Sequence, residues 1–454
     1  MLRFRLTVLV LMIHWLTVWA EDYSGTLPVM YINTEDTIAS KTKYVNATYY
    51  IDALGSQWFQ NIGSKEAPLT MQIKGHGNYT WTNADFVKKS YRIKLDEKAP
   101  LMGLNSNKHF ILLAHFDGEN GFLRNASGFW LSRELGLDYT PAEQPVEVVL
   151  NGRYAGLYFL TEKIRIERYR LNIAEQPDGE TDDELITGGW LVEIDNANDS
   201  HQIKFSVAGT DLGWLWITYH SPEVLSTKQR NYLREQINEI KRTVYTDDKE
   251  STEWEDIIDV SQLTRYYMVY EVIDHLEGFL GSCYLHKNRY DSHWKFGPVW
   301  DMGHAFNGWH DKNRFMYDYD GWSPCIIAEI AKFPRFQEEV RRVWQEFYPE
   351  KLRRMVDYMR LYAQYIEQAA LCDSRRWGVK SSADVYKTLE TCYSRLFEKV
   401  EFLRSQWGDG AIDEQTDKDT TVVKPHIIYN IKGQRLSEKP RHGVYIIDGK
   451  KYVR

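Results

Sequence analysis

A change of periodicity along the chain constrains the fold more than any other feature. Up to about residue 220, short segments rich in β-branched and aromatic residues are bounded by turn formers. Two of them, Met71–Lys74 and Ser90–Leu95, alternate strictly between apolar and polar residues, which is typical of half-buried antiparallel strands. After Thr227 the apolar spacing becomes helical. Strands followed by helices predict an α+β fold.

The β-rich part is expected to run from about residue 28 to residue 220, with one inserted helix. That helix is predicted over Leu123–Leu135, where the apolar residues have helical spacing and Gly136 follows. Asn151-Gly152 lies between two apolar runs. This dipeptide is the strongest short signal for a β-hairpin.

Residues 221–345 are predicted to form a helical part, and residues 346–408 a helical extension of it. Residues 409–424 are polar and lack periodicity, which indicates a linker. The strand patterns over 425–454 predict a small all-β tail, too short to be an independent catalytic unit. Within the helical part we expect helices at Lys228–Thr243, Asp259–Phe279 and between Phe333 and Trp407, and strands at Ser282–His286 and Lys295–Trp300.

The N-terminus has the pattern of a signal peptide over residues 1–20. Arg3 and Arg5 precede an apolar run over Leu6–Val18, and an acidic start follows at Glu21. The run is shorter than the ~20 residues of a membrane-spanning helix, and no later segment reaches that length. We therefore expect export to the periplasm, the cell surface or the medium, with an uncleaved N-terminal anchor as the alternative.

Composition excludes several classes of protein. The 454 residues carry a formal net charge of −8 and no long Lys/Arg run, so nucleic acid is not an expected partner. With 43% hydrophobic and 14% aromatic residues, the chain can bury a large core. Four cysteines are too few for a disulfide framework. Buried free thiols are favoured for most of them, although one disulfide stays open.

The first candidate site is the segment Gly75-His76-Gly77-Asn78, followed by Lys88, Lys89 and Arg92. A glycine-rich turn between strands lets backbone N–H groups approach a phosphate, and nearby cations neutralise its charge. The alternative is a plain glycine turn with solvated lysines.

The second candidate is Lys163, at the end of the apolar strand pattern that follows Asn151-Gly152. A lysine at a strand end can present its ammonium to a bound phosphate, held by a neighbouring carboxylate such as Glu162. A surface ion pair at the end of the strand is the alternative.

The third candidate is an acidic stripe on an apolar helical pattern. Glu271, Asp274 and Glu277 recur three residues apart and would share a helix face. Neighbouring like charges repel unless they are solvated or bind a cation. The apolar surroundings favour a bound cation over a solvated face.

The fourth candidate is the segment from Gly297 to Asn307. Asp301 follows a strand pattern and precedes Gly303 by two residues, which suits a hard divalent cation that carries phosphate oxygens. His304 is a further possible ligand or a hydrogen-bonded structural histidine. An Asp-Gly turn without function is the alternative.

These segments occur in an order that resembles the spore coat protein H (CotH) kinase family, over roughly residues 28–345. The order makes the resemblance specific, because each block alone is weak. The blocks are Lys74–Asn78 with Lys88–Lys94; Leu112–Asp117 with Leu123–Asn125; Glu147–Lys163; Gly188–Asp195; and Phe296–Asp301.

The resemblance implies an atypical protein-kinase-like fold of two lobes that binds ATP and Mg²⁺. It places Asp301 at the metal-binding aspartate, Glu277 at the aspartate of an Asn-x-Asp motif, and Lys89 and Lys163 at basic positions. The glycines Gly75 and Gly77 would belong to the nucleotide site. The chain departs from the family twice: Asn-x-Asp is His275-Leu276-Glu277 here, and the aspartate two residues after Asp301 is Gly303.

The leading functional hypothesis is a secreted kinase that phosphorylates Ser or Thr of exported or surface proteins. Lys163 would bind phosphate, Asp301 and Glu277 would hold Mg²⁺, and Glu277 would orient the acceptor hydroxyl. The alternative is a non-catalytic surface module, a pseudokinase that binds protein or polysaccharide. A metal-dependent hydrolase using Asp301, His304 and His310 is a third hypothesis.

The tail over 425–454 resembles the C-terminal sorting tails of exported Bacteroidetes proteins. This resemblance implies a secretion machinery as a partner, and it agrees with the signal-peptide pattern at the N-terminus.

Overall fold

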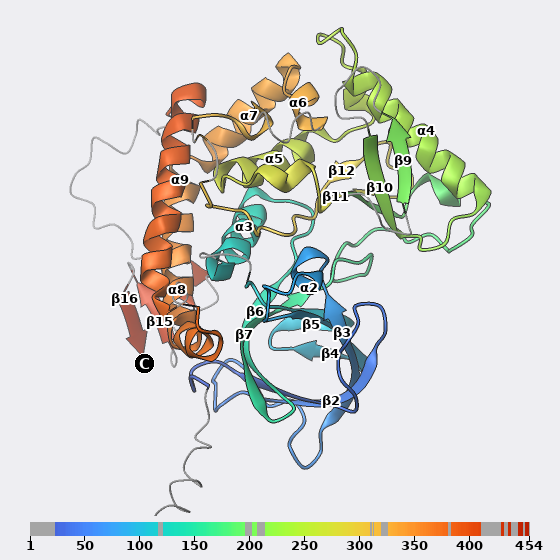
Figure 1. The fold of residues 1–454 in the computed structure, drawn as a ribbon. Helices are drawn as coiled ribbons and strands as arrows, with labels where there is room; N and C mark the ends of the chain where they lie inside the picture. The colour runs from blue at the N-terminus through green and yellow to red at the C-terminus, as the bar shows by residue number, and fades with distance from the viewer. Residues whose placement is uncertain are drawn as a thin grey trace, which may run out of the picture. The chain divides into compact units, whose positions relative to one another are not determined.

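The computed structural model describes residues 23–116, 121–195, 202–206, 214–308, 311, 313–318, 326–379, 383–409, 428–430, 435–436, 444–447 and 450–453. The chain divides into two compact units, which are described separately (Figure 1). Unit 1 comprises Met1–Phe116, Gln144–Leu160 and Ile366–Val385, and unit 2 comprises Asp117–Glu143, Thr161–Tyr365 and Tyr386–Arg454.

Unit 1 is built around a closed β-barrel (Figure 1). Its strand order is β1-β2-β3-β4-β5-β7-β6, and β1 closes the barrel by pairing antiparallel with β2 and parallel with β6. The α+β prediction is confirmed, but barrel closure depends on pairing between distant segments, which local patterns do not reveal. The strands are β1 (Val29–Thr34), β2 (Val45–Asp52), β3 (Leu69–His76), β4 (Ser90–Leu101), β5 (Leu104–Leu113), β6 (Glu143–Leu150) and β7 (Arg153–Glu162).

The two strictly alternating segments form neighbouring strands, as predicted. β3 and β4 pair antiparallel, with Ile73 opposite Ile93, and both side chains are fully buried. The predicted hairpin also forms between β6 and β7. Asn151 and Gly152 have φ angles of 51° and 73°, the left-handed conformation that a tight type I′ hairpin turn requires.

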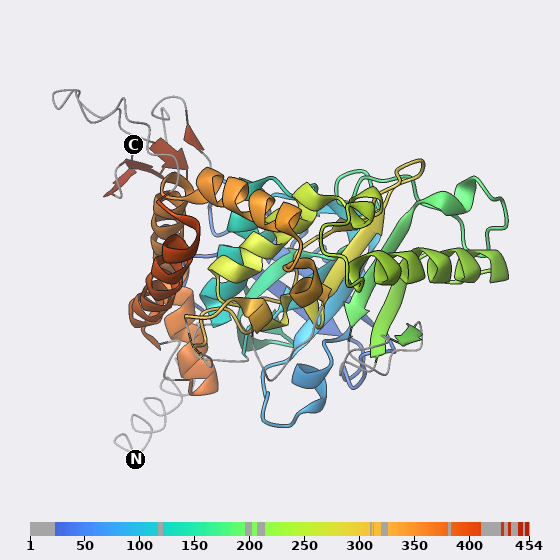
Figure 2. The ribbon, with the colours of Figure 1, turned by 90° about the horizontal axis from the view of Figure 1, so that it is seen from above.

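Unit 2 contains a five-stranded sheet in the order β12-β11-β8-β10-β9. β8 pairs antiparallel with β10 on one side and β11 on the other, so strands from both sides of residue 220 share one sheet. The predicted boundary near residue 220 therefore does not coincide with the division into units. Figure 2 shows α4 (Thr227–Val244) beside this sheet. The strands are β8 (Trp190–Asp195), β9 (Gln202–Ser206), β10 (Trp214–Ser221), β11 (Cys283–Lys287) and β12 (Lys295–Phe296).

The helices of unit 2 follow the predicted order but one ends early. α5 stops at Val272 instead of Phe279, because Asp274 has a φ of 56° and breaks the helix. The other helices are α3 (Gly121–Leu135), α5 (Val260–Val272), α6 (Ile326–Ile330), α7 (Pro334–Phe347), α8 (Glu350–Trp377) and α9 (Val385–Trp407), with short 3-10 turns η1 (Leu185–Thr187), η2 (Glu253–Asp256), η3 (Leu276–Phe279) and η4 (Met316–Asp318). The end of α8 belongs to unit 1.

The C-terminal residues contain a four-stranded sheet in the order β14-β13-β15-β16. Its strands are β13 (Ile428–Asn430), β14 (Arg435–Leu436), β15 (Val444–Ile447) and β16 (Lys450–Val453), so the predicted tail does contain β-structure. The predicted signal peptide and nearly all of the predicted linker lie outside the described residues. No helix in the described part of the chain is long and apolar enough to span a bilayer.

The cysteines agree with the favoured expectation where the structure describes them. Cys283, Cys372 and Cys392 are free thiols, and Cys283 and Cys392 are buried. Cys325 lies outside the described residues.

A buried ion pair in unit 1 fastens the end of α8 to the barrel. Lys88 Nζ lies 2.7 Å from Asp373 Oδ1 and donates to the carbonyl oxygens of Ala114 (3.0 Å) and Leu157 (2.5 Å). The Leu157 amide donates to the same carboxylate (2.8 Å). A Cβ on Gly156 would lie 2.2 Å from Asp373 Oδ1, so glycine allows this close approach.

We predict that Lys88→Met destabilises the protein by about 3–5 kcal/mol, because it leaves Asp373 buried without its cation. The measurement is the free energy of unfolding in urea. Exposed Lys65 provides the control, since Lys65→Met should change it by less than about 0.5 kcal/mol. Equal effects of the two substitutions would contradict the assignment.

Candidate functional site

Backbone contacts in unit 2 join the end of α5 to the segment after β12. The Phe306 amide donates to the Ile273 carbonyl oxygen (3.0 Å), and His275 Nε2 lies 2.9 Å from the carbonyl oxygen of Asp301. Burial, and secondarily His304, lower the pKa of His275 to about 3. The imidazole is therefore neutral at pH 7, and its Nε2–H donates to Asp301, because a carbonyl oxygen only accepts.

Asp301 has a strained backbone that its neighbours hold in place. Its φ is 52°, a value uncommon outside glycine. On one side, the Tyr270 hydroxyl accepts from the Trp300 amide (3.0 Å) and donates to the Trp300 carbonyl oxygen (2.9 Å). On the other side, the Met302 amide donates to Asn125 Oδ1 (3.0 Å). Such strain persists only where the surroundings enforce it, and it is commonest at functional sites.

Glu277 in η3 interacts electrostatically with Asp301. Burial, and then the negative charge of Asp301, raise the pKa of Glu277 from 4.5 to about 7. His304 Nδ1 lies 3.3 Å from Glu277 Oε2, and both side chains are 31% exposed. The structure thus places a pair of carboxylates and an imidazole within reach of solvent.

This carboxylate pair fits a magnesium ion. A divalent cation relieves the repulsion between two neighbouring carboxylates, and Mg²⁺ is usually held by one or two carboxylates together with water and phosphate oxygens. Asp301 and Glu277 supply that number. Among the residues that the structure describes, no group of three or more His, Cys, Asp or Glu side chains is arranged to hold a metal ion.

Glu271 and Asp274 do not continue a common acidic face with Glu277, contrary to the prediction. The helix ends at Val272, so the three carboxylates do not follow one helical spacing. Lys399 Nζ, on α9, lies 2.5 Å from Glu271 Oε1 and 3.5 Å from Asp274 Oδ1. The cation beside these two carboxylates is thus an ammonium of the chain itself.

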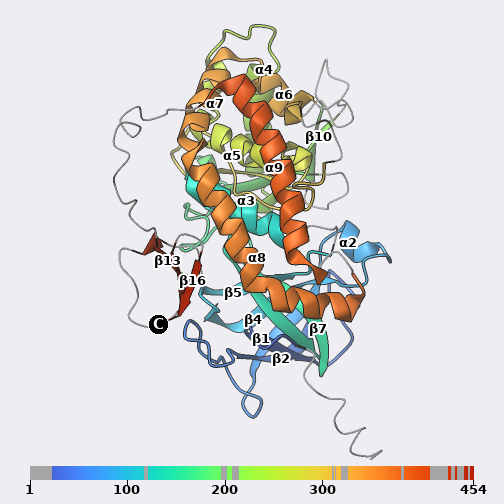
Figure 3. The same ribbon diagram turned by 90° about the vertical axis from the view of Figure 1, so that its left-hand side faces the viewer.

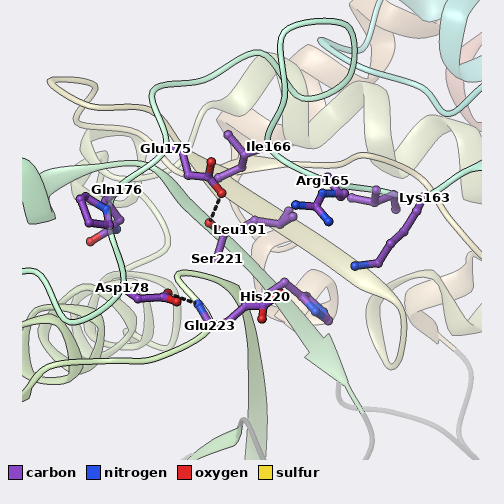
Figure 4. Close-up of a pocket in the computed structure, with 12 residues that line it drawn as sticks. Lys163, Arg165, Ile166, Glu175, Gln176, Asp178, Leu191, His220, Ser221 and Glu223 are labelled. Atoms are coloured by element: carbon purple, nitrogen blue, oxygen red, sulfur yellow. Dashed lines mark hydrogen bonds between the residues drawn. The ribbon is translucent and has the colours of Figure 1, made fainter. Parts of the chain in front are cut away.

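Lys163 lines a cavity of about 510 Å³ in unit 2 (Figure 4). Figure 4 shows the side chains of Lys163, Arg165 and His220 directed toward the same space. His220 Nε2 lies 2.6 Å from Glu193 Oε2, which orients the ring. Three basic side chains therefore converge at one part of the cavity, and the carboxylates that line it are Glu175, Asp178 and Glu223.

The apolar lining of this cavity connects it to the carboxylate pair. Ile164, Ile166 and Leu191 line the cavity and belong to one buried hydrophobic cluster. Trp300 packs against the same cluster and directly precedes Asp301. Lys163 and Asp301 thus flank one apolar cluster of unit 2.

Gly75 and Gly77 lie in unit 1, beside the short helix α2 (Tyr79–Thr82) between β3 and β4. A Cβ on Gly75 would lie 2.5 Å from the Trp81 ring, so the indole covers this glycine. Gly77 has a φ of 92°, which makes it the turn residue. Both glycines therefore have a role in the packing of their own loop.

Lys89 also lies in unit 1 and ties down this loop. Its Nζ donates to the carbonyl oxygens of Thr80 (3.0 Å), Trp81 (3.0 Å) and Asn83 (2.9 Å). An ammonium has three donors, so these contacts use all of them. They give Lys89 a structural role and lend no support to its predicted contact with phosphate.

Sequence patterns missed several residues around the site. Arg165 could have been found, because in Lys163-Ile-Arg-Ile166 the basic and apolar residues alternate, which directs both basic side chains to one side of an extended segment. Lys399 had no local signal, since its partners Glu271, Asp274 and Arg314 all belong to distant parts of the sequence. His310, named in the hydrolase hypothesis, lies outside the described residues.

Comparison with protein families identifies the class of protein. The family model described as CotH kinase protein matches residues 72–406. The chain belongs to the CotH kinase family, as the order of its motifs predicted, and this membership suggests a kinase-like function. The match extends past residue 345 and includes most of α9. No curated protein is significantly similar to the chain.

We predict that Glu277→Gln stabilises the metal-free protein at pH 8 by about 1–2 kcal/mol. The pKa of Glu277 in the folded protein, about 7, exceeds its ordinary value of 4.5. The folded state thus favours the protonated carboxyl, and that stabilisation is lost as the pH rises from 4.5 to 7. Unfolding in EDTA at pH 4.5, 6 and 8 measures the difference.

The control for this prediction is Asp247→Asn, at an exposed carboxylate of the same unit. Its effect on the free energy of unfolding should be small. A pH-independent effect of Glu277→Gln would contradict the raised pKa.

Proposed function

We propose that this chain is an exported atypical protein kinase that transfers the γ-phosphoryl group of ATP to Ser or Thr of exported or surface proteins. The Glu277–Asp301 carboxylate pair, in a chain of the CotH kinase family, carries the proposal. Phosphoryl transfer depends mainly on positioning and on stabilising charge. A carboxylate pair suited to a cation supplies the central part of such a site.

Asp301 and Glu277 would hold one Mg²⁺ through their carboxylate oxygens. Bound there, the ion would supply positive charge for the transferred phosphoryl group and the leaving oxygen. Glu277 would also orient the acceptor hydroxyl, and His304, 3.3 Å from its carboxylate, would keep that side chain in place.

The cavity beside Lys163 is suited to the nucleotide. Lys163 and Arg165 provide cations for the phosphates, and the buried Ile164, Ile166 and Leu191 offer an apolar surface for a base. The carboxylates in its lining can accept hydrogen bonds from ribose hydroxyls. Since this lining and Trp300 share one hydrophobic cluster, the cavity and Asp301 can serve the same ligand.

The departures from the family pattern favour one metal ion over two. Gly303 offers no carboxylate, and its carbonyl oxygen accepts a hydrogen bond from Arg124. A guanidinium at this position opposes a second cation and can offset negative charge of the phosphates.

Export is the part of the proposal that rests on sequence alone. The signal-peptide pattern over 1–20 and the tail over 425–454 support it. The tail makes a secretion machinery of the Bacteroidetes type a proposed partner.

A non-catalytic binding module is the second candidate. One observation favours it: Trp81 covers Gly75, and Lys89 uses its donors within the same loop. A loop closed by its own side chains has less backbone to offer to phosphate than an open glycine loop.

The test is Mg²⁺-dependent ATP binding to the purified chain, measured by calorimetry. We expect micromolar affinity that falls at least about tenfold in Asp301→Asn, in Lys163→Met and without Mg²⁺, because each change removes a charge that the nucleotide complex needs. Asp247→Asn should bind like the unchanged protein.

Binding that survives Asp301→Asn or omission of Mg²⁺ would contradict the role of the carboxylate pair. The absence of binding at millimolar ATP with either Mg²⁺ or Mn²⁺ would overturn the kinase proposal in favour of the non-catalytic module.

A further inference from the structure

Lys399 on α9 is a buried lysine beside the C-terminal end of α5. Its side chain is 1% exposed, and its Nζ lies 2.5 Å from Glu271 Oε1 and 3.5 Å from Asp274 Oδ1. It also donates to the Arg314 carbonyl oxygen at 2.6 Å. The three contacts lie on two stretches of chain outside α9, residues 271–274 and Arg314.

Two of these contacts fix the segment that leads to Glu277. Glu271 lies in the last turn of α5, and Asp274, with its left-handed φ of 56°, directly precedes His275. The Asp274 amide donates to the Glu271 carbonyl oxygen (3.2 Å), and the His275 amide to that of Tyr270 (2.9 Å). The direction of the chain at Asp274 therefore decides where Glu277 lies.

The third contact holds residues further along the chain from Asp301. Glu271 Oε2 accepts a hydrogen bond from the Met316 amide (3.0 Å), so Glu271 and Lys399 together hold residues 314–316. Phe315 stacks on Trp407 of α9, with ring centroids 5.4 Å apart. Figure 3 shows α9 lying against the region of α5.

The charges make Lys399 difficult to replace. Glu271 and Asp274 are 0% and 4% exposed, and two buried carboxylates near one ammonium are costly unless that cation compensates them. Without the ammonium, Asp274, whose backbone is strained, loses the contact of its carboxylate with Lys399. Both carboxylates lie within six residues of Glu277, so a shift there moves the site.

We propose that Lys399 is a positioning residue of the Glu277–Asp301 site. Through this residue, α9 would help to place the two carboxylates. The inference rests on the proposed kinase function. Lys399 acts through Glu271, Asp274 and the carbonyl of Arg314. It sets the distance and direction between the segments that carry Glu277 and Asp301.

The test compares Lys399→Met with Lys399→Arg, which keeps the charge, and with the double variant Lys399→Met/Glu271→Gln. The double variant removes one positive and one negative charge, so the net charge of the cluster is unchanged and folding is favoured. Lys88→Met is the matched control, because Lys88 is also a buried lysine paired with an aspartate, in unit 1.

Hydrogen exchange gives a readout independent of kinase activity. We expect Lys399→Met and the double variant to speed exchange at the Phe306 amide at least about tenfold, while the Leu157 amide is unchanged. Lys88→Met should have the opposite pattern, because Leu157 donates to the partner of Lys88. Two results would overturn the inference. One is an unchanged exchange rate at the Phe306 amide in both Lys399→Met and the double variant. The other is an equally faster exchange at that amide in Lys88→Met.

Kinetics with Mg²⁺-ATP and a Ser/Thr substrate provide the second readout. A misplaced site should lower kcat by about 10²-fold with the KM for ATP within about threefold, and Lys399→Arg should recover part of the loss. Unchanged kcat in Lys399→Met would overturn the inference. If the unchanged protein neither binds ATP nor phosphorylates, the kinase proposal fails, while the exchange rates and the affinity for Mn²⁺ alone still decide whether Lys399 positions the carboxylates.

Discussion

The burial of Glu277, together with the negative charge of Asp301, is the constraint on this part of unit 2. The charge of Asp301 helps to raise the pKa of Glu277 to about 7, so keeping the two side chains together has a cost in folding free energy. The contacts of His275 and Ile273 with the segment around Asp301 and Phe306 oppose that cost. Such a cost in stability is common at functional sites.

The carboxylates of the chain have two kinds of surroundings. Where an acidic cluster is structural, an internal ammonium compensates it, as Lys399 does for Glu271 and as Lys88 does for Asp373. Glu277 instead lies 3.3 Å from the imidazole of His304, and both side chains remain 31% exposed. Glu277 therefore differs from Glu271 and Asp373 in its access to solvent.

The family resemblance and the local patterns predicted the site unevenly. Asp301 and Glu277 could be named from sequence because a strand end and a motif position marked them, and the structure supplies an electrostatic interaction between them. Lys89 could not be judged from sequence, since its three carbonyl partners belong to a loop whose folding no pattern describes. Lys163 was marked by its place after an apolar strand, and the alternation that follows it could also have indicated Arg165. Only the cavity revealed that His220 lies beside them.

The sequence by itself determined the α+β class, the alternating strands, the hairpin at Asn151-Gly152 and membership of the CotH kinase family, because short-range periodicity and motif order carry that information. Only the tertiary structure decided the closure of the barrel by β1 and β6 and the early end of α5. It also decided that strands from before and after residue 220 pair in one sheet. It also decided that Lys399 is the cation of Glu271. Each of these depends on partners far apart in the chain, and local patterns cannot specify which distant groups meet.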